Sequence, residues 1–320
     1  MGRKKMKKLI IIAAALTLVS CSIFASLTVT DNSSVVSGLY STIGNGAAAS
    51  GMGNAYMGMA QDAVALFWNP AGIENMKKED NSYNLFFSHN QWLMSTIIDS
   101  LSVATKVKDV GTFAAGFSYF NSGEMERYTT DDAGHPIDMN TTFSTYALNL
   151  NIAYANQLDK DVDFGVTVKY FLDDMDGSAV NAVAFDLGVR YFVPIIKGLS
   201  FDLVATNFGG EMSGFTISKE MTFAGLYNFS IADWGFNAEY DLVGRLNNSP
   251  ENRFGLEVKT PYLIVLRAGY YTEDDLIDSG FKDISFGLGL LVNSKYNIDF
   301  SFEPYGELGT AYKLSFGASF

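Results

Sequence analysis

Apolar and polar residues alternate along most of this chain with a period of two. In Val162–Leu172, Val183–Val193, Trp234–Leu242 and Lys295–Phe302, every second residue is apolar, and most residues between them are polar, charged or glycine. Successive side chains of a β-strand point to opposite faces, so each segment predicts a strand with one apolar and one polar face. The pattern therefore indicates an all-β protein.

A transmembrane β-barrel and a soluble β-sandwich both show this alternation. Three features favour the barrel: strands of about ten residues, aromatic residues near strand ends, and charges of both signs on one face, which suits a wet lumen. We predict a transmembrane antiparallel β-barrel of about 14 strands with a short N-terminal hatch. The expected strands span residues 82–89, 99–107, 112–120, 141–155, 161–172, 179–193, 199–207, 218–229, 232–243, 252–260, 262–272, 282–293, 295–303 and 310–320.

The predicted connections alternate in length. Long acidic loops are expected at 121–140, 173–179 and 272–282, and short turns at 156–161 and 195–198. Bacterial barrels place long loops outside the cell and short turns in the periplasm, which gives the expected orientation. The last strand alternates up to a terminal phenylalanine and resembles the signal by which the barrel-insertion machinery recognises its substrates.

The first residues predict export. A basic segment, MGRKKMKK, precedes the apolar run Leu9–Val19, which is typical of a secretory signal peptide; the alternative is a buried N-terminal helix. Leu18–Cys21 resembles a bacterial lipobox that would leave a lipid on Cys21, whereas cleavage after Ala25 or Ser26 would discard this cysteine. The predicted division is a signal peptide at 1–25, a hatch at 26–78 and a barrel at 79–320.

Cysteine content and charge narrow the possibilities further. Cys21 is the only cysteine, so the mature chain would have no disulfide, and a closed hydrogen-bonded barrel would supply its stability. Removal of residues 1–25 takes away five basic residues and no acidic one, which changes the net charge from −13 to −18. Such an acidic protein is not expected to bind nucleic acid, which requires a basic face.

One segment, Gly51–Gly72, differs from the alternating strands because it is rich in Gly, Ala and Met. We predict that Asp62 caps a short helix, that Asn69-Pro70-Ala71-Gly72 forms a type I turn, and that the small residues of 44–60 let the backbone lie against a barrel wall. The segment would then be a plug, although a folding cap without gating is the alternative. The residues expected to form the hatch gate are Asp62, Trp68, Asn69, Pro70, Ala71 and Gly72.

Two motifs carry a family resemblance. GMGNAY followed by AQDAVALFWNPAGI resembles the N-terminal motif of FadL-type outer-membrane transporters, and more so that of their PorV/PorQ-like relatives, including spirochaete members. Residues 154–209 are also similar to the PorV-like pattern, in which DLG on one strand is followed by NxG after the next, here Asp186–Gly188 and Asn207–Gly209. The resemblance implies a fourteen-stranded barrel with an N-terminal hatch.

The sequence offers little catalytic chemistry. His89 beside Ser88 raises the alternative of a membrane phospholipase, but an interfacial histidine is favoured. His135 lies among acidic loop residues that could hold a divalent cation weakly, although solvated loop charge is favoured: Asp131, Asp132 and Asp138. The sequence has no CxxC, HExxH or phosphate-binding glycine loop. We expect neither an enzyme nor a cofactor or metal.

The first functional hypothesis is passive transport across the outer membrane of a diderm bacterium. FadL-type proteins carry long-chain fatty acids, so the resemblance implies a hydrophobic small molecule as ligand. A fatty acid needs an apolar pocket and a cation for its carboxylate. Lys169, Arg190 and Arg267 are the candidate cations, although each could equally pair with an inward carboxylate: Asp163, Asp186 or Glu257.

The second hypothesis is an interaction protein, because PorV-like proteins handle secreted cargo at the outer membrane. Such a role would need exposed apolar or aromatic loop tips. The predicted loops are acidic and polar, which favours transport. A structural porin-like barrel without a fixed ligand is the third alternative.

Overall fold

The computed structural model describes residues 38–76, 82–212, 214–245, 249–272, 283–293 and 295–320. The predicted signal peptide and the lipidation site Cys21 lie outside these residues, as does the acidic segment 273–282. Among the described residues, no helix has the length and apolar character needed to cross a membrane.

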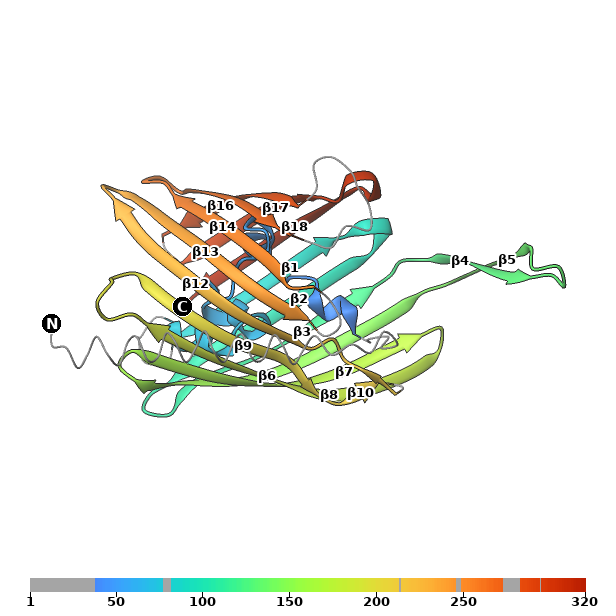
Figure 1. The fold of residues 1–320 in the computed structure, drawn as a ribbon, viewed down its shortest axis with the longest axis horizontal. Helices are drawn as coiled ribbons and strands as arrows, with labels where there is room; N and C mark the ends of the chain where they lie inside the picture. The colour runs from blue at the N-terminus through green and yellow to red at the C-terminus, as the bar shows by residue number, and fades with distance from the viewer. Residues whose placement is uncertain (1–37, 77–81, 213, 246–248, 273–282, 294) are drawn as a thin grey trace.

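Fourteen strands form one closed antiparallel sheet, which confirms the predicted barrel (Figure 1). Strand β1 pairs with β18 to close it, with Phe87 opposite Phe316. Closure pairs the backbone groups of all fourteen strands, as a hydrocarbon environment requires. The strands are β1 (Tyr83–Gln91), β2 (Ile97–Val107), β3 (Gly111–Asn121), β6 (Thr145–Asp159), β7 (Val162–Met175), β8 (Ser178–Phe192), β9 (Leu199–Gly209), β12 (Glu220–Ile231), β13 (Trp234–Arg245), β14 (Glu251–Lys259), β15 (Ile264–Tyr271), β16 (Ile284–Val292), β17 (Tyr296–Pro304) and β18 (Thr310–Ser319).

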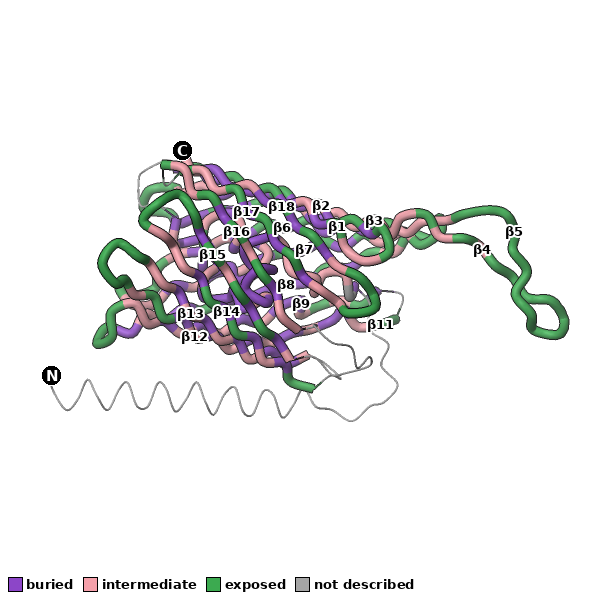
Figure 2. Tube along the Cα trace, turned by 90° about the horizontal axis from the view of Figure 1, so that it is seen from above, coloured by how far each residue is buried: buried purple, intermediate pink, exposed green. Residues whose placement is uncertain are grey.

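The two faces of the wall differ as the alternation predicts. Figure 2 shows buried and exposed residues alternating along the strands. Outward-facing Leu187, Phe286 and Leu314 expose 57%, 50% and 49% of their surface. Inward-facing Asp186 and Ser315 expose only 1% each. An apolar outer face on a closed barrel is the property of a transmembrane barrel, because only lipid can cover it.

The connections divide between the two ends of the barrel. The longer connections follow β3, β9 and β15 and lie at one end, which we call the long-loop mouth. The short connections after β2, β6 and β12 lie at the other end, the short-turn mouth, together with Phe320. Two 3₁₀ turns also lie at the long-loop mouth, η4 (Leu93–Ser95) and η5 (Gly306–Leu308).

Two loop predictions are wrong. The segment 121–140 is mostly a hairpin of β4 (Met125–Thr130) and β5 (Pro136–Phe143), which projects away from the barrel (Figure 1). The segment 173–179 is a tight turn at Asp176-Gly177, because β7 and β8 extend beyond their predicted ends. A small pairing of β10 (Glu211–Met212) with β11 (Phe215–Thr216) follows β9.

Residues 38–76, which we call the hatch, lie within the barrel (Figure 1). They contain η1 (Leu39–Thr42), α2 (Ala47–Gly51), η2 (Asp62–Phe67) and η3 (Pro70–Asn75). Helix α2 packs against β15–β18, η2 against β1–β3 and η3 against β6–β8. The lumen at this level is therefore packed with protein, and the predicted wet lumen is wrong there.

Candidate functional site

Wall carboxylates hold the hatch backbone in place. The Asp241 carboxylate accepts hydrogen bonds from the Tyr56 and Met57 amides at 3.0 and 3.2 Å. The Glu239 carboxylate accepts from the Gly58 and Met59 amides at 2.5 and 2.9 Å. Both carboxylates are buried on the inward face of β13. Four consecutive amides of the hatch thus find their acceptors on two neighbouring inward residues of one strand.

Asn69 joins the turn to both the wall and the hatch. Its Nδ2 donates to Asp202 Oδ1 at 2.7 Å and to the Met57 carbonyl at 3.2 Å, while its Oδ1 accepts from the Ala71 amide at 3.1 Å. The Gly72 amide donates to the Asn69 carbonyl at 2.9 Å, which confirms the predicted turn, and η3 then continues it. The side chain is fully buried, so its three bonds replace those it would make with water.

Glycines on the wall face glycines and small residues on the hatch. A Cβ on Gly269 would lie 1.9 Å from the Gly53 nitrogen, and one on Gly165 would lie 2.3 Å from the Pro70 carbonyl carbon. Real side chains do not approach so closely. The prediction that small hatch residues allow close backbone approach is confirmed, and the wall supplies matching glycines.

The prediction that Asp62 caps a helix is wrong. The N-cap of η2 is Gln61, no side chain caps it, and Asp62 is the first residue within the 3₁₀ helix. Its positive φ of 59° explains the difference, because the chain bends there rather than entering an α-helix. Trp68 ends this helix; its indole donates to the Asn45 carbonyl at 2.9 Å and packs edge-on against Tyr56.

A chamber of about 940 Å³ lies at the long-loop mouth. Its lining is largely aromatic and apolar. The hatch contributes six residues to it: Gly38, Tyr40, Thr42, Ile43, Gly44 and Asn54. Burial raises the pKa of the Tyr40 phenol, and the Asp173 carboxylate that it donates to raises that pKa further. The phenol therefore stays a protonated donor. The aromatic lining residues are Tyr40, Trp92, Phe120, Tyr146, Phe215, Tyr271 and Tyr305.

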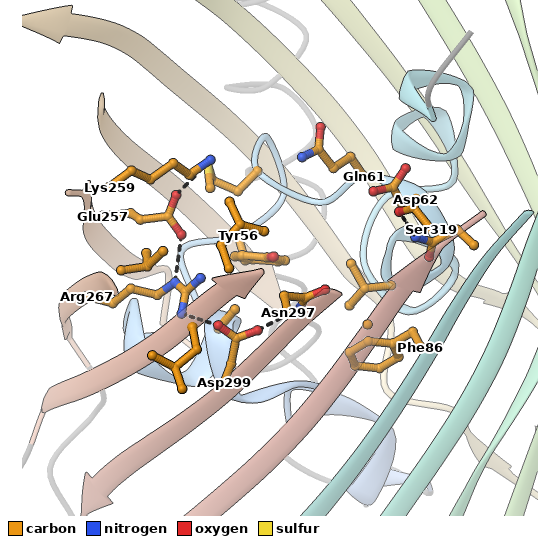
Figure 3. A pocket seen from close by; sticks show the side chains of 18 of the residues that line it. Tyr56, Gln61, Asp62, Phe86, Glu257, Lys259, Arg267, Asn297, Asp299 and Ser319 are labelled. Carbon is orange, nitrogen blue, oxygen red and sulfur yellow. Dashed lines mark hydrogen bonds and ion pairs between the residues drawn. The ribbon is translucent and has the colours of Figure 1, made fainter. Parts of the chain in front are cut away.

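A second, smaller chamber of about 300 Å³ lies at the short-turn mouth, on the other side of the hatch (Figure 3). Arg267 contacts Glu257 at 2.7 Å and Asp299 at 2.6 Å on one wall of it. Tyr56 lies beside this group, and burial raises the pKa of its phenol. This lining is more polar than that of the long-loop chamber.

The predicted carboxylate-binding cations are all engaged within the wall. Lys169 pairs with Asp186 at 2.7 Å and also donates to Asn207, whose backbone amide donates to Asp186. The two motifs of the family resemblance, DLG and NxG, therefore meet in one buried network.

Arg190 and Arg267 are engaged in a similar way. Arg190 pairs with Asp202 at 2.6 Å and donates to the hatch carbonyls of Met57 and Ala60. Neither Lys169 nor Arg190 lines the two chambers, whereas Arg267 lines the smaller one. Three other cations line the larger chamber: Arg245, Arg253 and Lys313.

The two histidines lie apart from the chambers. His89 contacts Asp99 at 2.6 Å on the outward face, whereas Ser88 is buried on the inward face. Adjacent strand residues point to opposite faces, so the two cannot form a nucleophile and base. His135 contacts Asp131 at 3.1 Å at the exposed hairpin tip. Within the described residues, no three His, Cys, Asp or Glu side chains are grouped to hold a metal ion.

Sequence reasoning missed the role of Glu239 and Asp241. It placed both on the polar face of β13, but a charged inward residue could equally face water. The signal that could have found this role lies in the hatch sequence. A segment rich in Gly and Ala has few side chains to cover its backbone amides, and buried amides require hydrogen-bond acceptors.

Solved structures share this fold. No family model matches the chain, and no curated protein matches it in sequence. The Ralstonia pickettii toluene transporter TbuX is similar at 12% identity, over 86% of this chain and 97% of that one, with a TM-score of 0.56. The Pseudomonas putida toluene transporter TodX is similar at 13% identity, over 86% and 96%, with a TM-score of 0.53.

A third similar structure is a Pseudomonas aeruginosa FadL homologue, at 10% identity over 86% of this chain and 98% of that one, with a TM-score of 0.51. At these identities the likeness is one of fold. It shows that the chain shares the barrel fold of these proteins.

Proposed function

We propose that this protein is an outer-membrane channel that takes up hydrophobic small molecules through the chamber at the long-loop mouth. The observation that carries the proposal is that chamber: about 940 Å³, lined mainly by aromatic and apolar side chains, with the hatch as its floor. Pockets that hold small apolar ligands have this size and lining. The fold shared with toluene transporters and a FadL homologue supports the same class of cargo.

A carboxylate-bearing cargo, such as a long-chain fatty acid, is the finer form of this proposal. Arg253 and Lys313 lie together on the lining of the larger chamber, and they replace Lys169 and Arg190 as the proposed carboxylate partners. Arg253 already contacts Glu251 at 2.7 Å, and Lys313 donates to the Gly44 carbonyl at 2.9 Å. A fatty acid would compete with these internal partners, whereas a neutral aromatic hydrocarbon would leave them in place.

The test is mass spectrometry of what co-purifies with the detergent-extracted protein from its native membrane. We expect near-stoichiometric lipophilic molecules, and their class decides between fatty acids and neutral aromatics. Arg253→Gln is the test variant, because it removes the charge and keeps a neutral side chain that can form hydrogen bonds. It should release a fatty acid and retain a hydrocarbon. A chamber that is empty in the native protein, and that takes up neither compound when offered, contradicts the proposal.

A PorV-like role in docking secreted proteins is the second candidate, and one observation favours it. The β4–β5 hairpin projects away from the barrel (Figure 1), and it exposes large apolar side chains. Tyr128, Ile137 and Met139 leave 54%, 47% and 48% of their surface exposed. Co-purification of secreted proteins with an empty barrel, lost on shortening this hairpin to a tight turn, would support docking over transport.

A further inference from the structure

Three buried side chains on neighbouring strands of the wall form a cluster that the proposed transport does not use. Lys169 lies on β7, Asp186 on β8 and Asn207 on β9, and they expose only 5%, 1% and 2% of their surface. Lys169 Nζ lies 2.7 Å from Asp186 Oδ2 and donates a hydrogen bond of 2.9 Å to Asn207 Oδ1. An amine, a carboxylate and a side-chain amide therefore meet in one site that is closed to bulk water.

A β-bulge turns the Asn207 side chain toward the lumen. The register of β8 against β9 shifts at this point, so that Asp186 faces two residues of β9, Thr206 and Asn207, rather than one. Both residues are buried, although neighbouring side chains of a regular strand point to opposite faces. Asn207 also has a positive φ of 59°, a conformation in which asparagine is enriched. The bulge thus places inside the barrel an amide that a regular strand would have pointed toward the lipid.

Hydrogen bonds fix the orientation of the Asn207 amide. The Asn207 backbone N–H donates to Asp186 Oδ1 at 2.8 Å. Its Nδ2 donates to the Ser218 carbonyl at 2.9 Å and to the Ser41 hydroxyl at 3.2 Å. The amide oxygen therefore faces the amine of Lys169, and the amide nitrogen is held by other partners. Nζ lies beside the carbonyl group whose carbon it would attack, and such preorganisation replaces the entropy cost of an encounter.

We propose that this cluster forms an intramolecular isopeptide bond between Lys169 and Asn207, with Asp186 as the proton-transfer group. The inference does not depend on what the barrel transports. Lys169 gives a proton to Asp186 along their 2.7 Å contact, and the neutral amine attacks Asn207 Cγ. The Nζ–Cγ bond forms, and the Cγ–Nδ2 bond breaks with its electron pair on Nδ2. Ammonia leaves.

The protons of this reaction balance without a co-reactant. The ammonium group of Lys169 gives up two of its three protons. One passes through Asp186 to Nδ2, which departs as ammonia, and the other stays on Asp186. Two charges are costly to keep out of water, and the first proton transfer removes both of them. The exclusion of bulk water also leaves the amine as the nucleophile beside Asn207 Cγ.

The bond would tie β9 to β7 across the intervening strand β8. The pairing of β9 with β12 ends at Thr206, whereas β9 continues to Gly209 against β8. The cluster lies at the level where β9 leaves one of its two neighbours. A covalent link there would hold the end of β9 in the wall after its pairing with β12 has stopped.

Peptide mapping of the unfolded native protein tests for the bond directly. Trypsin requires a free lysine amine, so the bond should abolish cleavage after Lys169. The expected product is a branched peptide that joins residues 161–190 to residues 198–219, lighter than their sum by one ammonia molecule. Lys313 is the internal control, because it is equally buried but donates to a backbone carbonyl rather than to an asparagine side chain. Trypsin should cleave after it.

Refolding shows whether the reaction is autocatalytic. Chains purified unfolded from inclusion bodies are weighed by mass spectrometry before and after refolding into detergent, so differences at the N-terminus cancel. We expect folding to lower the mass by one ammonia molecule. Lys169→Arg keeps a positive charge beside Asp186 but does not lose its proton, so it should keep its full mass and be cleaved at position 169. Asp186→Asn lacks the proton acceptor and should also keep its full mass.

The native protein decides the inference even if neither variant folds. Cleavage after Lys169 in the native protein, without the branched peptide, overturns it. A loss of ammonia that persists in Lys169→Arg also overturns it, because an asparagine can lose ammonia by ring closure onto its own backbone. A branched peptide that forms in Asp186→Asn as readily as in the native chain removes Asp186 from the reaction.

Discussion

At the scale of single residues, glycine and carboxylate positions on the wall decide where the hatch lies. Gly165 on β7 faces the Pro70-Ala71 peptide so closely that no side chain fits between them. Asp202, Glu239 and Asp241 then accept hydrogen bonds from the Asn69 side chain or from hatch amides. At these positions the wall therefore contacts the hatch through the hatch backbone and the Asn69 side chain.

Gly165→Ala tests this fit. The added Cβ would lie 2.3 Å from the Pro70 carbonyl carbon, so the turn must move away from β7. We expect a loss of about 1–3 kcal/mol in the free energy of unfolding, the usual cost of overpacking. The measurement is urea unfolding of the detergent-solubilised protein. Gly225→Ala is the control, because the nearest atom to its Cβ is a Phe201 ring carbon at 3.5 Å. Equal stability of the two variants would contradict the fit.

The same residues show how far the sequence could specify the site. The NPAG block was recognisable because Asn, Pro and Gly each have a fixed place in a turn. The inward glycines were visible in the alternation, but a glycine in a strand has several explanations. Lys169 and Arg190 were placed correctly on the inward face. Lys169 pairs with Asp186 and Arg267 with Glu257, two of the carboxylates that the sequence offered as partners. The Arg190 partner, Asp202, was not among them, because the register of β8 against β9 decides which carboxylate lies opposite.

At the scale of elements, the barrel strands were predictable and the projecting hairpin was not. A strand between lipid and lumen must alternate, so the period-two pattern placed all fourteen. Strands β4 and β5 are exposed on both faces, so their sequences show no alternation of apolar and polar residues. Their pairing depends on a turn instead, in which the Asp131 carboxylate accepts hydrogen bonds from the Ala133 and His135 amides at 2.9 and 2.8 Å.

This turn predicts a local pH dependence. Hydrogen bonds from the His135 backbone and side chain hold the pKa of Asp131 below its ordinary value. A depressed pKa means that the turn is stabilised above the unfolded-state pKa of about 3.9 and loses this stabilisation as the pH falls through the lower folded-state value. The Ala133 and His135 amide chemical shifts in detergent micelles should follow that titration. Asp131→Asn, which still accepts but does not titrate, should show no such step; a step that persists would assign it to another group.

At the scale of the whole molecule, closure joins the first and last strands of the barrel. The Tyr83 amide donates to the Phe320 carbonyl at 3.2 Å, and the Phe320 amide donates back to the Tyr83 carbonyl at 2.8 Å. The Phe320 ring packs edge-on against Tyr296 and is otherwise largely exposed at the short-turn mouth. Phe320 therefore supplies both a closing hydrogen-bond pair and the aromatic ring that we expect the insertion machinery to recognise.

Deletion of Phe320 and Phe320→Ala separate these two contributions. The substitution keeps the backbone pair and removes only the ring, whereas the deletion removes both. If recognition depends on the aromatic ring, both variants should lose most of their insertion into the outer membrane, scored by the heat-sensitive gel mobility of folded barrels. If closure dominates, Phe320→Ala should insert like the native protein, and the deletion alone should fail.

We expect both variants to lose insertion. A single exposed hydrogen-bond pair contributes only about 0.5–1.5 kcal/mol per bond to a sheet that the other thirteen strand pairings already hold. Refolding of the purified chains into detergent, without any insertion machinery, is the control, and there both variants should fold.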